Sequence, residues 1–203
     1  MASKDEPSKK VCAILPDGKE FEGDMVNGVP DGDGVMKFIN RDIYRGSWVN
    51  GRIEGIGKYR FYDKKRSKYI AKYEGEFKDS LINGFGNMEY ADGAVYSGYW
   101  KNGLRNGEGQ LYFPSGRILS GLWNDDSLVD GVCINPDGSH YSGGLSNECS
   151  YSGYGSLFFP DGLWAQGYWQ DGELVEGKIF NPNGNVFGIE NRVVVFAQKW
   201  RSE

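Results

Sequence analysis

Apolar and polar residues alternate with a period of two along most of this chain. In residues 96–101, Tyr96, Gly98 and Trp100 alternate with more polar neighbours. A period of two predicts a β-strand with these three residues on one face. A glycine- and asparagine-rich loop follows at 102–109, and residues 110–113 are predicted to form a second strand. One sequence unit therefore predicts one β-hairpin.

The hairpin pattern recurs at a nearly fixed step. Its phrase, an aromatic or apolar residue, any residue, glycine, any residue and a second apolar residue, starts at positions 21, 44, 73, 96, 119, 141 and 165. Repeats of about this length indicate a linear array in which each unit is buried against its neighbours. Turn signals such as 16–18 and 160–162 separate the units, and a half unit begins near Val11.

The glycine between the two aromatic positions has a predicted role. Because glycine lacks a side chain, a ring from the neighbouring strand can lie flat over the backbone there. We expect most of the repeated Tyr, Trp and Phe rings to form the core. A fraction of each ring would still line an open groove.

Two stretches, 44–57 and 96–109, match the phrase Tyr-x-Gly-x-Trp followed by x-x-Gly-x-x-x-Gly-x-Gly. This pattern resembles the MORN repeat (membrane occupation and recognition nexus), and the resemblance covers about residues 11–187. It implies an all-β fold, an elongated single-layer antiparallel sheet of tandem β-hairpins twisted into a half-pipe. We expect a flexible tail at 1–10, seven units plus a half unit at 11–187, and a capping segment at 188–203.

The resemblance also implies a function. MORN proteins are typically non-catalytic scaffolds whose concave aromatic groove holds a helix or an extended peptide of a partner protein. A cytoplasmic location follows, within a cytoskeletal, ciliary (axonemal) or membrane-associated assembly. The residues predicted to line the groove are Tyr44, Trp48, Tyr73, Phe77, Tyr96, Trp100 and Trp123.

An alternative function rests on six extra residues in the second unit. They lengthen a hairpin whose tip is rich in basic residues, and each basic residue near an anionic membrane contributes about 1 kcal/mol of binding. The tip is then a contact for acidic phospholipid or another anionic partner, or else a solvated and idle loop. The basic residues are Lys64, Lys65, Arg66, Lys68 and Lys72.

Composition narrows the class further. The chain has 203 residues with 31 Gly and 6 Trp, 13 Tyr and 11 Phe, and this aromatic content predicts a folded chain rather than a disordered glycine-rich one. A net charge of −5 disfavours nucleic-acid binding. No apolar run approaches the roughly 20 residues of a membrane span. The odd set Cys12, Cys133 and Cys149 indicates free thiols in a reducing compartment.

The sequence carries no recognisable catalytic or metal-binding pattern. His140 is the single histidine, and its spacing from Cys133 and Cys149 fits no zinc site. Gly-x-Gly, as at 32–34, occurs in predicted turns and never opens a helix, so it predicts no phosphate cradle. We therefore expect no enzyme activity, no cofactor and no metal.

The last units depart from the pattern. Leu119 and Ala165 stand where Tyr is expected, and Leu145 stands where Trp is expected. These units either cap the stack or carry a contact surface of their own. Residues 193–196 predict a final strand or an element folded over the sheet end. They either cap the array or join two molecules by strand addition, giving a homodimer through the C-terminal end.

Overall fold

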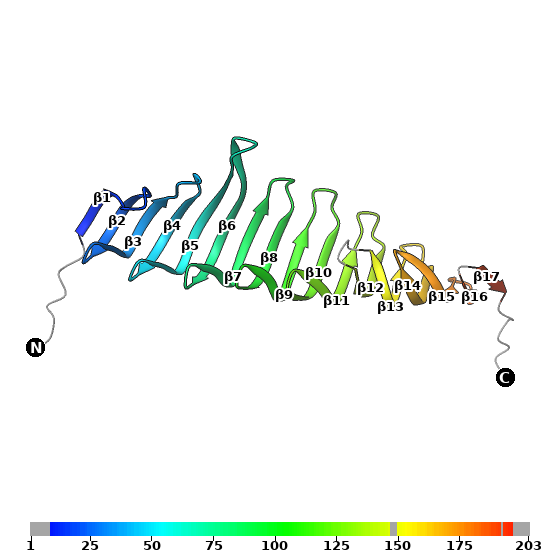
Figure 1. The fold of residues 1–203 in the computed structure, drawn as a ribbon. Helices are drawn as coiled ribbons and strands as arrows, with labels where there is room; N and C mark the ends of the chain where they lie inside the picture. Colours follow the sequence, from blue (N-terminus) through cyan, green and yellow to red (C-terminus); the bar gives the residue numbers. More distant parts are fainter. Residues whose placement is uncertain (1–8, 147–149, 192, 197–203) are drawn as a thin grey trace, which may run out of the picture. The chain divides into compact units, whose positions relative to one another are not determined.

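The structure, a computed structural model, describes residues 9–146, 150–191 and 193–196, and it consists of β-strands joined by short turns (Figure 1). The chain divides into two compact units, residues 1–104 and 105–203. In unit 1 each strand pairs antiparallel with the next one in the chain. The strands of unit 1 are β1 (Lys9–Ile14), β2 (Glu20–Val26), β3 (Val29–Lys37), β4 (Ile43–Val49), β5 (Arg52–Asp63), β6 (Lys68–Lys78), β7 (Leu81–Tyr90) and β8 (Val95–Lys101).

Unit 2 is built in the same way, and its strands also pair antiparallel in chain order. They are β9 (Leu104–Tyr112), β10 (Ile118–Asn124), β11 (Ser127–Ile134), β12 (His140–Leu145), β13 (Tyr151–Phe158), β14 (Trp164–Gln170), β15 (Glu173–Phe180), β16 (Val186–Glu190) and β17 (Val193–Phe196). In each unit taken by itself the predicted fold class is confirmed, an all-β, single-layer antiparallel sheet of tandem hairpins twisted into a half-pipe.

The repeats are aligned by pairs of glycines that face each other across each hairpin. Gly46 pairs with Gly57 and Gly75 with Gly86 in unit 1. The same pairing persists where the sequence pattern decays, as between Gly167 and Gly177 in unit 2. The weaker copies therefore keep the hairpin of the strong ones.

The turns are shorter than the sequence predicts. The sequence predicts a loop at 102–109, but only Asn102 and Gly103 turn, both with positive φ, and β9 already begins at Leu104. The remaining glycines of the motif lie inside strands. Gly55 and Gly84 have φ of 71° and 87° and lie where the register shifts between β4 and β5 and between β6 and β7. At these β-bulges one strand carries extra residues relative to its partner, so glycines that the sequence assigns to a loop lie within the strand.

The two ends of the chain are described only in part. Residues 1–8 of the predicted tail and residues 197–203 of the predicted cap lie outside the described residues, and β1 begins within the expected tail at Lys9. At the other end, residues 193–196 form a strand, β17, that pairs with β16. The predicted division at residue 188 falls inside β16 and stays a prediction.

Candidate partner-binding surfaces

Each strand presents two faces, which we call the ring face and the opposite face. The ring face carries the first and last residues of the repeated phrase, and the opposite face carries the residues that alternate with them. On the ring face Tyr44, Tyr73 and Tyr96 have no exposed surface. Each hydroxyl donates a hydrogen bond to the carbonyl three residues further on, at 3.1, 3.0 and 3.2 Å respectively. The tyrosine ring thus lies along its own strand.

The paired glycines make room for these rings. A Cβ added at Gly57 would lie inside van der Waals contact of the Tyr44 ring, and one at Gly86 would do the same to the Tyr73 ring. The glycine role expected from the sequence is therefore present, with one correction. The ring that covers the glycine pair comes from the strand of the first glycine rather than from a neighbouring strand.

Burial keeps these phenols in their neutral, hydrogen-bonding form. Loss of hydration raises the pKa of Tyr44 to about 12 and also raises the pKa of Tyr73. Both hydroxyls therefore remain donors at any physiological pH, and the ring face contributes no titratable charge from these residues.

Rings of successive repeats meet edge to face. Tyr44 contacts Phe77 at 5.1 Å between centroids, and Tyr73 contacts Trp100 at 5.7 Å. Such pairs contribute about 0.5–1.5 kcal/mol each beyond the area they bury. Because each contact joins one hairpin to the next, the ring face is the core that holds each unit together.

The indole groups add hydrogen bonds to this core, with one exception. The indole N–H of Trp100 donates to the carbonyl of Gly86, and that of Trp169 donates to the carbonyl of Gly155, both at 3.1 Å. The N–H of Trp48 is buried and has no hydrogen-bond partner among the described residues.

The seven residues predicted to line the groove all belong to the ring face of their own unit. Tyr44, Trp48, Tyr73, Phe77, Tyr96 and Trp100 lie in unit 1, and Trp123 lies in unit 2. None is more than 5% exposed. The expectation that most of each ring is core therefore holds. Their predicted contact with a partner stays a prediction.

The open surface of unit 1 lies on the opposite face. A cleft of about 570 Å³ is hollowed there over β1–β4. Except for Val11, which pairs with Gly23, the side chains that line it alternate in sequence with the ring-face residues, so they point away from the core. Its lining includes the basic residues Lys10 and Arg45 and the acidic residues Glu22 and Asp33. Cys12 and Val35 also line it.

Side chains on the opposite face form rows across the strands. Row 1 contains the residue that precedes each repeat's first aromatic position and its partner across the hairpin. In unit 1 this row is largely charged. Its members, in strand order, are Glu20, Lys37, Ile43, Arg60, Lys72, Glu89 and Val95.

Row 2 lies beside row 1 and is also charged in unit 1. It contains the residue that follows the first aromatic position, with its cross-strand partner. Ion pairs join strands in both rows, as Lys72 to Glu89 at 2.7 Å and Lys58 to Glu74 at 2.8 Å. The members of row 2 are Glu22, Val35, Arg45, Lys58, Glu74, Asn87 and Ser97.

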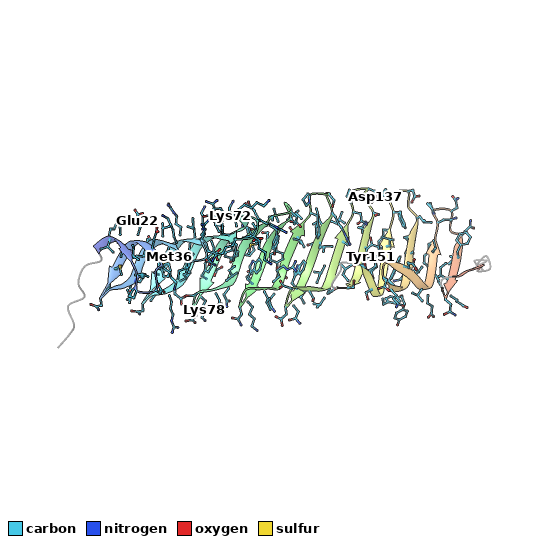
Figure 2. All side chains as sticks on the ribbon, turned by 45° about the horizontal axis from the view of Figure 1, so that its top comes forward. Glu22, Met36, Lys72, Lys78, Asp137 and Tyr151 are labelled. Carbon is cyan, nitrogen blue, oxygen red and sulfur yellow. The ribbon has the colours of Figure 1, made fainter. Side chains whose placement is uncertain are left out.

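The basic residues of the inserted hairpin differ in their surroundings. The β5–β6 hairpin projects beyond its neighbours (Figure 1), and Lys64, Lys65 and Lys68 are exposed at its tip. The Nε atom of Arg66 lies 3.6 Å from Oδ2 of Asp63 and forms an ion pair with it. Lys72 lies away from the tip in row 1, on the same side of unit 1 as Glu22 (Figure 2). The structure therefore splits the predicted cluster into a tip of lysines and a paired lysine on the sheet.

Sequence reasoning missed a buried carboxylate that accepts hydrogen bonds from β5 of this hairpin. Asp42 is 7% exposed and lies in the turn before β4. Its carboxylate accepts hydrogen bonds from the Tyr59 hydroxyl at 2.9 Å and the Tyr62 amide at 2.7 Å. The Asn40 side chain adds a third at 2.6 Å. An aspartate next to a turn looks like an ordinary turn residue in sequence, so no local signal marks this role.

His140, the single histidine, packs against an aromatic ring. It stacks on Phe158 with centroids 4.9 Å apart. Cys133 is buried, and Cys149 lies outside the described residues. Over the described part of the chain, no three His, Cys, Asp or Glu side chains gather as a metal site, and no helix is long and apolar enough to cross a membrane.

A known protein family shares the repeats that form these hairpins. The family model described as MORN repeat matches residues 21–43, 44–66, 73–95 and 96–116. The chain carries MORN repeats. The gap between the second and third matches, 67–72, falls in the inserted hairpin of the second MORN unit. The weaker hairpins that start at 119, 141 and 165 follow the matched ones and keep the same glycine pairing.

Individual relatives share only part of this MORN array. Alsin of Rattus norvegicus and Alsin of Homo sapiens are each 35% identical over 75 residues, which is 37% of this chain. The match spans 4% of the length of either Alsin. A solved structure of the G-box domain of the microcephaly protein CPAP, whose analysis suggests a role in centriole elongation, is similar in fold. It is 11% identical, covers 94% of this chain and 100% of its own, and has a TM-score of 0.51.

Proposed function

We propose that this MORN-repeat protein is a non-catalytic scaffold that binds a segment of a partner protein. The carrying observation is the charged cleft on the opposite face of unit 1, set on a sheet whose core is closed by its own rings. The packed ring face keeps the sheet rigid, and the opposite face is accessible to solvent. Such a surface can bind without reorganising, which lowers the entropy loss on association. The partner segment is a helix or an extended peptide.

Two surfaces compete for this role, the seven buried rings of the predicted groove and the opposite face. Buried rings reach a partner only if the ring face opens, whereas the side chains of the cleft are already accessible. The opposite face is therefore our preferred contact. Arg45 lines the cleft, and Lys58, which pairs with Glu74, lies beside it in row 2, so the complementary partner segment carries acidic residues there.

The experiment compares variants of the two surfaces in partner capture from cells. Arg45→Glu with Lys58→Glu reverses charge on the opposite face, and Trp100→Ala removes a ring from the ring face. We expect the first variant to lose the partners that wild type recovers. Trp100→Ala, checked for folding by circular dichroism, should keep them. Loss only with folded Trp100→Ala would assign binding to the ring face, and recovery unchanged by both variants would reject both surfaces.

Acidic phospholipid is the alternative ligand. The observation in its favour is the exposed trio Lys64, Lys65 and Lys68 at the tip of the projecting hairpin. Flotation with anionic vesicles at low and physiological salt tests it, with all three lysines changed to Gln as the matched control. Absence of wild-type binding at low salt would end this alternative.

The cytoplasmic, cytoskeletal or ciliary location implied by the family stays part of the proposal. Proximity labelling in cells, read by mass spectrometry, tests it together with partner identity. Recovery of axonemal or other cytoskeletal proteins is expected. A labelled set without such proteins would contradict the location and leave the scaffold role to the capture experiment.

A further inference from the structure

Row 1 changes character completely in unit 2. In unit 1 it contains charged residues on most strands, but in unit 2 none of its members is an acid, a lysine or an arginine. The strand register joins them into one continuous row. From β9 to β16 the row contains Tyr112, Ile118, Ile134, His140, Phe158, Trp164, Phe180 and Val186.

The centre of this row is a stack of parallel rings. His140 lies on Phe158 at 4.9 Å between centroids, Phe158 lies on Trp164 at 5.8 Å, and Trp164 lies on Phe180 at 3.9 Å. The planes are inclined by only 15°, 14° and 7°. Cross-strand stacking fixes the rings side by side, so they form a rigid apolar ridge on the opposite face.

Row 2 forms a valley beside the ridge. Its members from β9 to β14 are uncharged, and Lys178 follows on β15, opposite Gln166. On the far side of the valley Tyr154 and Tyr168, 56% and 58% exposed, form a second ridge with centroids 5.3 Å apart. The residues of the valley are Gln110, Ser120, Val132, Ser142, Ser156 and Gln166.

The repeat does not require apolar residues at these positions. At the register of Trp164 and Phe180, unit 1 places Lys72 and Glu89, which form an ion pair. The hairpin therefore folds with charges at these positions. Phe158, Trp164 and Phe180 are half-buried by their own stacking, and Tyr112 and Ile134 of the same row are exposed. Together they leave apolar area open that the MORN fold itself does not require, and such area marks an interaction site.

We propose that the opposite face of unit 2 packs against the same face of a second copy of this chain. Three properties favour a second copy over another occupant. The large residues of row 1 lie beside the smaller residues of row 2, so a two-fold rotation can set row 1 of each copy against row 2 of the other. Rows 1 and 2 carry no charge apart from Lys178, so two copies that meet through these rows do not repel each other there and need no charged partner.

The available area is the third property. Strands β9–β16 at about 4.8 Å spacing span about 38 Å, and rows 1 and 2 together with the row of Tyr154 and Tyr168 span roughly 14–20 Å, which gives about 500–750 Å² per copy. The third row also carries Glu108, Asp130 and Glu176, which lie at the edge of this area. Two copies bury about 1,000–1,500 Å², which passes the roughly 1,000 Å² that a specific interface needs. Sheets packed in this way lie about 10 Å apart, a distance that interdigitated rings fill.

Analytical ultracentrifugation of the full chain tests the proposal. Wild type should sediment as two copies at on the order of 50 µM protein, the concentration at which a modest interface of this size is populated. The test variant combines Trp164→Lys with Phe180→Glu and so transplants the ion pair of Lys72 and Glu89. Because unit 1 folds with that pair at the same register, the variant should fold and sediment as one copy.

The matched control acts on the other unit. Phe85 and Tyr99 form an exposed pair in unit 1, 45% and 50% exposed, at a ring distance of 5.5 Å. Phe85→Ser with Tyr99→Ser should leave the two-copy mass unchanged. If the charged variant does not fold by circular dichroism, Tyr154→Ser with Tyr168→Ser replaces it, since both rings are exposed.

Three results overturn the proposal. These are a wild type that stays single at this concentration, a folded unit 2 variant that keeps the two-copy mass, and a control variant that loses it. The second result would instead favour the C-terminal end predicted from the sequence, where strand addition at β17 would not depend on Trp164 or Phe180.

Discussion

At the scale of single residues, two tryptophans at the same repeat position differ in one hydrogen bond. The Trp100 indole N–H donates to Gly86, whereas the Trp48 N–H is buried without a partner among the described residues. A buried unpaired donor costs about 1–3 kcal/mol. The repeat therefore keeps tryptophan at position 48 for its packing volume, against Phe21 and Tyr44, rather than for its N–H.

This difference predicts unequal costs for the same substitution. Trp48→Phe and Trp100→Phe remove similar volume, but only the second breaks a hydrogen bond, and the first removes an unpaired donor. We expect Trp48→Phe to be less destabilising than Trp100→Phe by about 1–3 kcal/mol. Urea unfolding of both variants measures this difference. Equal midpoints would mean that the Trp48 N–H is satisfied in solution.

The glycine pairs give a second residue-scale prediction. Alanine at Gly86 places a methyl group against the Tyr73 ring, so Gly86→Ala should destabilise the protein by about 3 kcal/mol. Gly103 has φ of 84° but open space around it, so Gly103→Ala should cost only the backbone term of about 1 kcal/mol. Thermal or urea unfolding distinguishes the two. Similar losses would mean that backbone conformation, not ring packing, selects these glycines.

At the scale of strands and hairpins, the sequence predicts the elements well and their surfaces poorly. The period of two and the turn residues locate the hairpins, and the Tyr-x-Gly-x-Trp phrase locates the core, because both signals are local. The predicted loop at 102–109 is wrong, because glycine is common both in β-bulges and in turns and the sequence alone does not distinguish the two. The ring stack from His140 to Phe180 could not be predicted, since its members become neighbours only through the strand register.

The inserted hairpin depends on a buried carboxylate, which gives an element-scale prediction. In Asp42→Asn, one carboxylate oxygen becomes an amide NH2 group that faces donors from Tyr59 or Tyr62, and the negative charge is lost, so two or more hydrogen bonds weaken. We expect about 2–3 kcal/mol of destabilisation and faster hydrogen exchange at the Tyr62 amide. Asp92→Asn is the control, because the Asp92 side chain accepts from the Ala94 amide within its own turn. Unchanged exchange at Tyr62 would show that strand pairing alone holds the hairpin.

At the scale of the whole molecule, the two units use one fold for two kinds of surface. Both have a ring face that is closed on itself, so we expect the residues that vary between repeats on the opposite face to decide what each unit binds. Unit 1 presents ion pairs and a charged cleft, while unit 2 presents a ridge of rings beside a valley of serines. We therefore expect one chain to bind a charged segment with one unit and an apolar surface with the other.

This division predicts opposite responses to salt. Raising ionic strength from about 0.05 M to about 0.5 M shortens the Debye length severalfold and weakens contacts between exposed charges. Partner binding through the Arg45 and Lys58 side of unit 1 should therefore fall steeply, mainly through a slower association rate. Self-association through the ring stack of unit 2 should hold or strengthen, because burial of apolar surface does not depend on charge. Ultracentrifugation and surface plasmon resonance over the same salt series measure both responses. If self-association fell with salt in parallel with partner binding, charged residues rather than stacked rings would hold the two copies together.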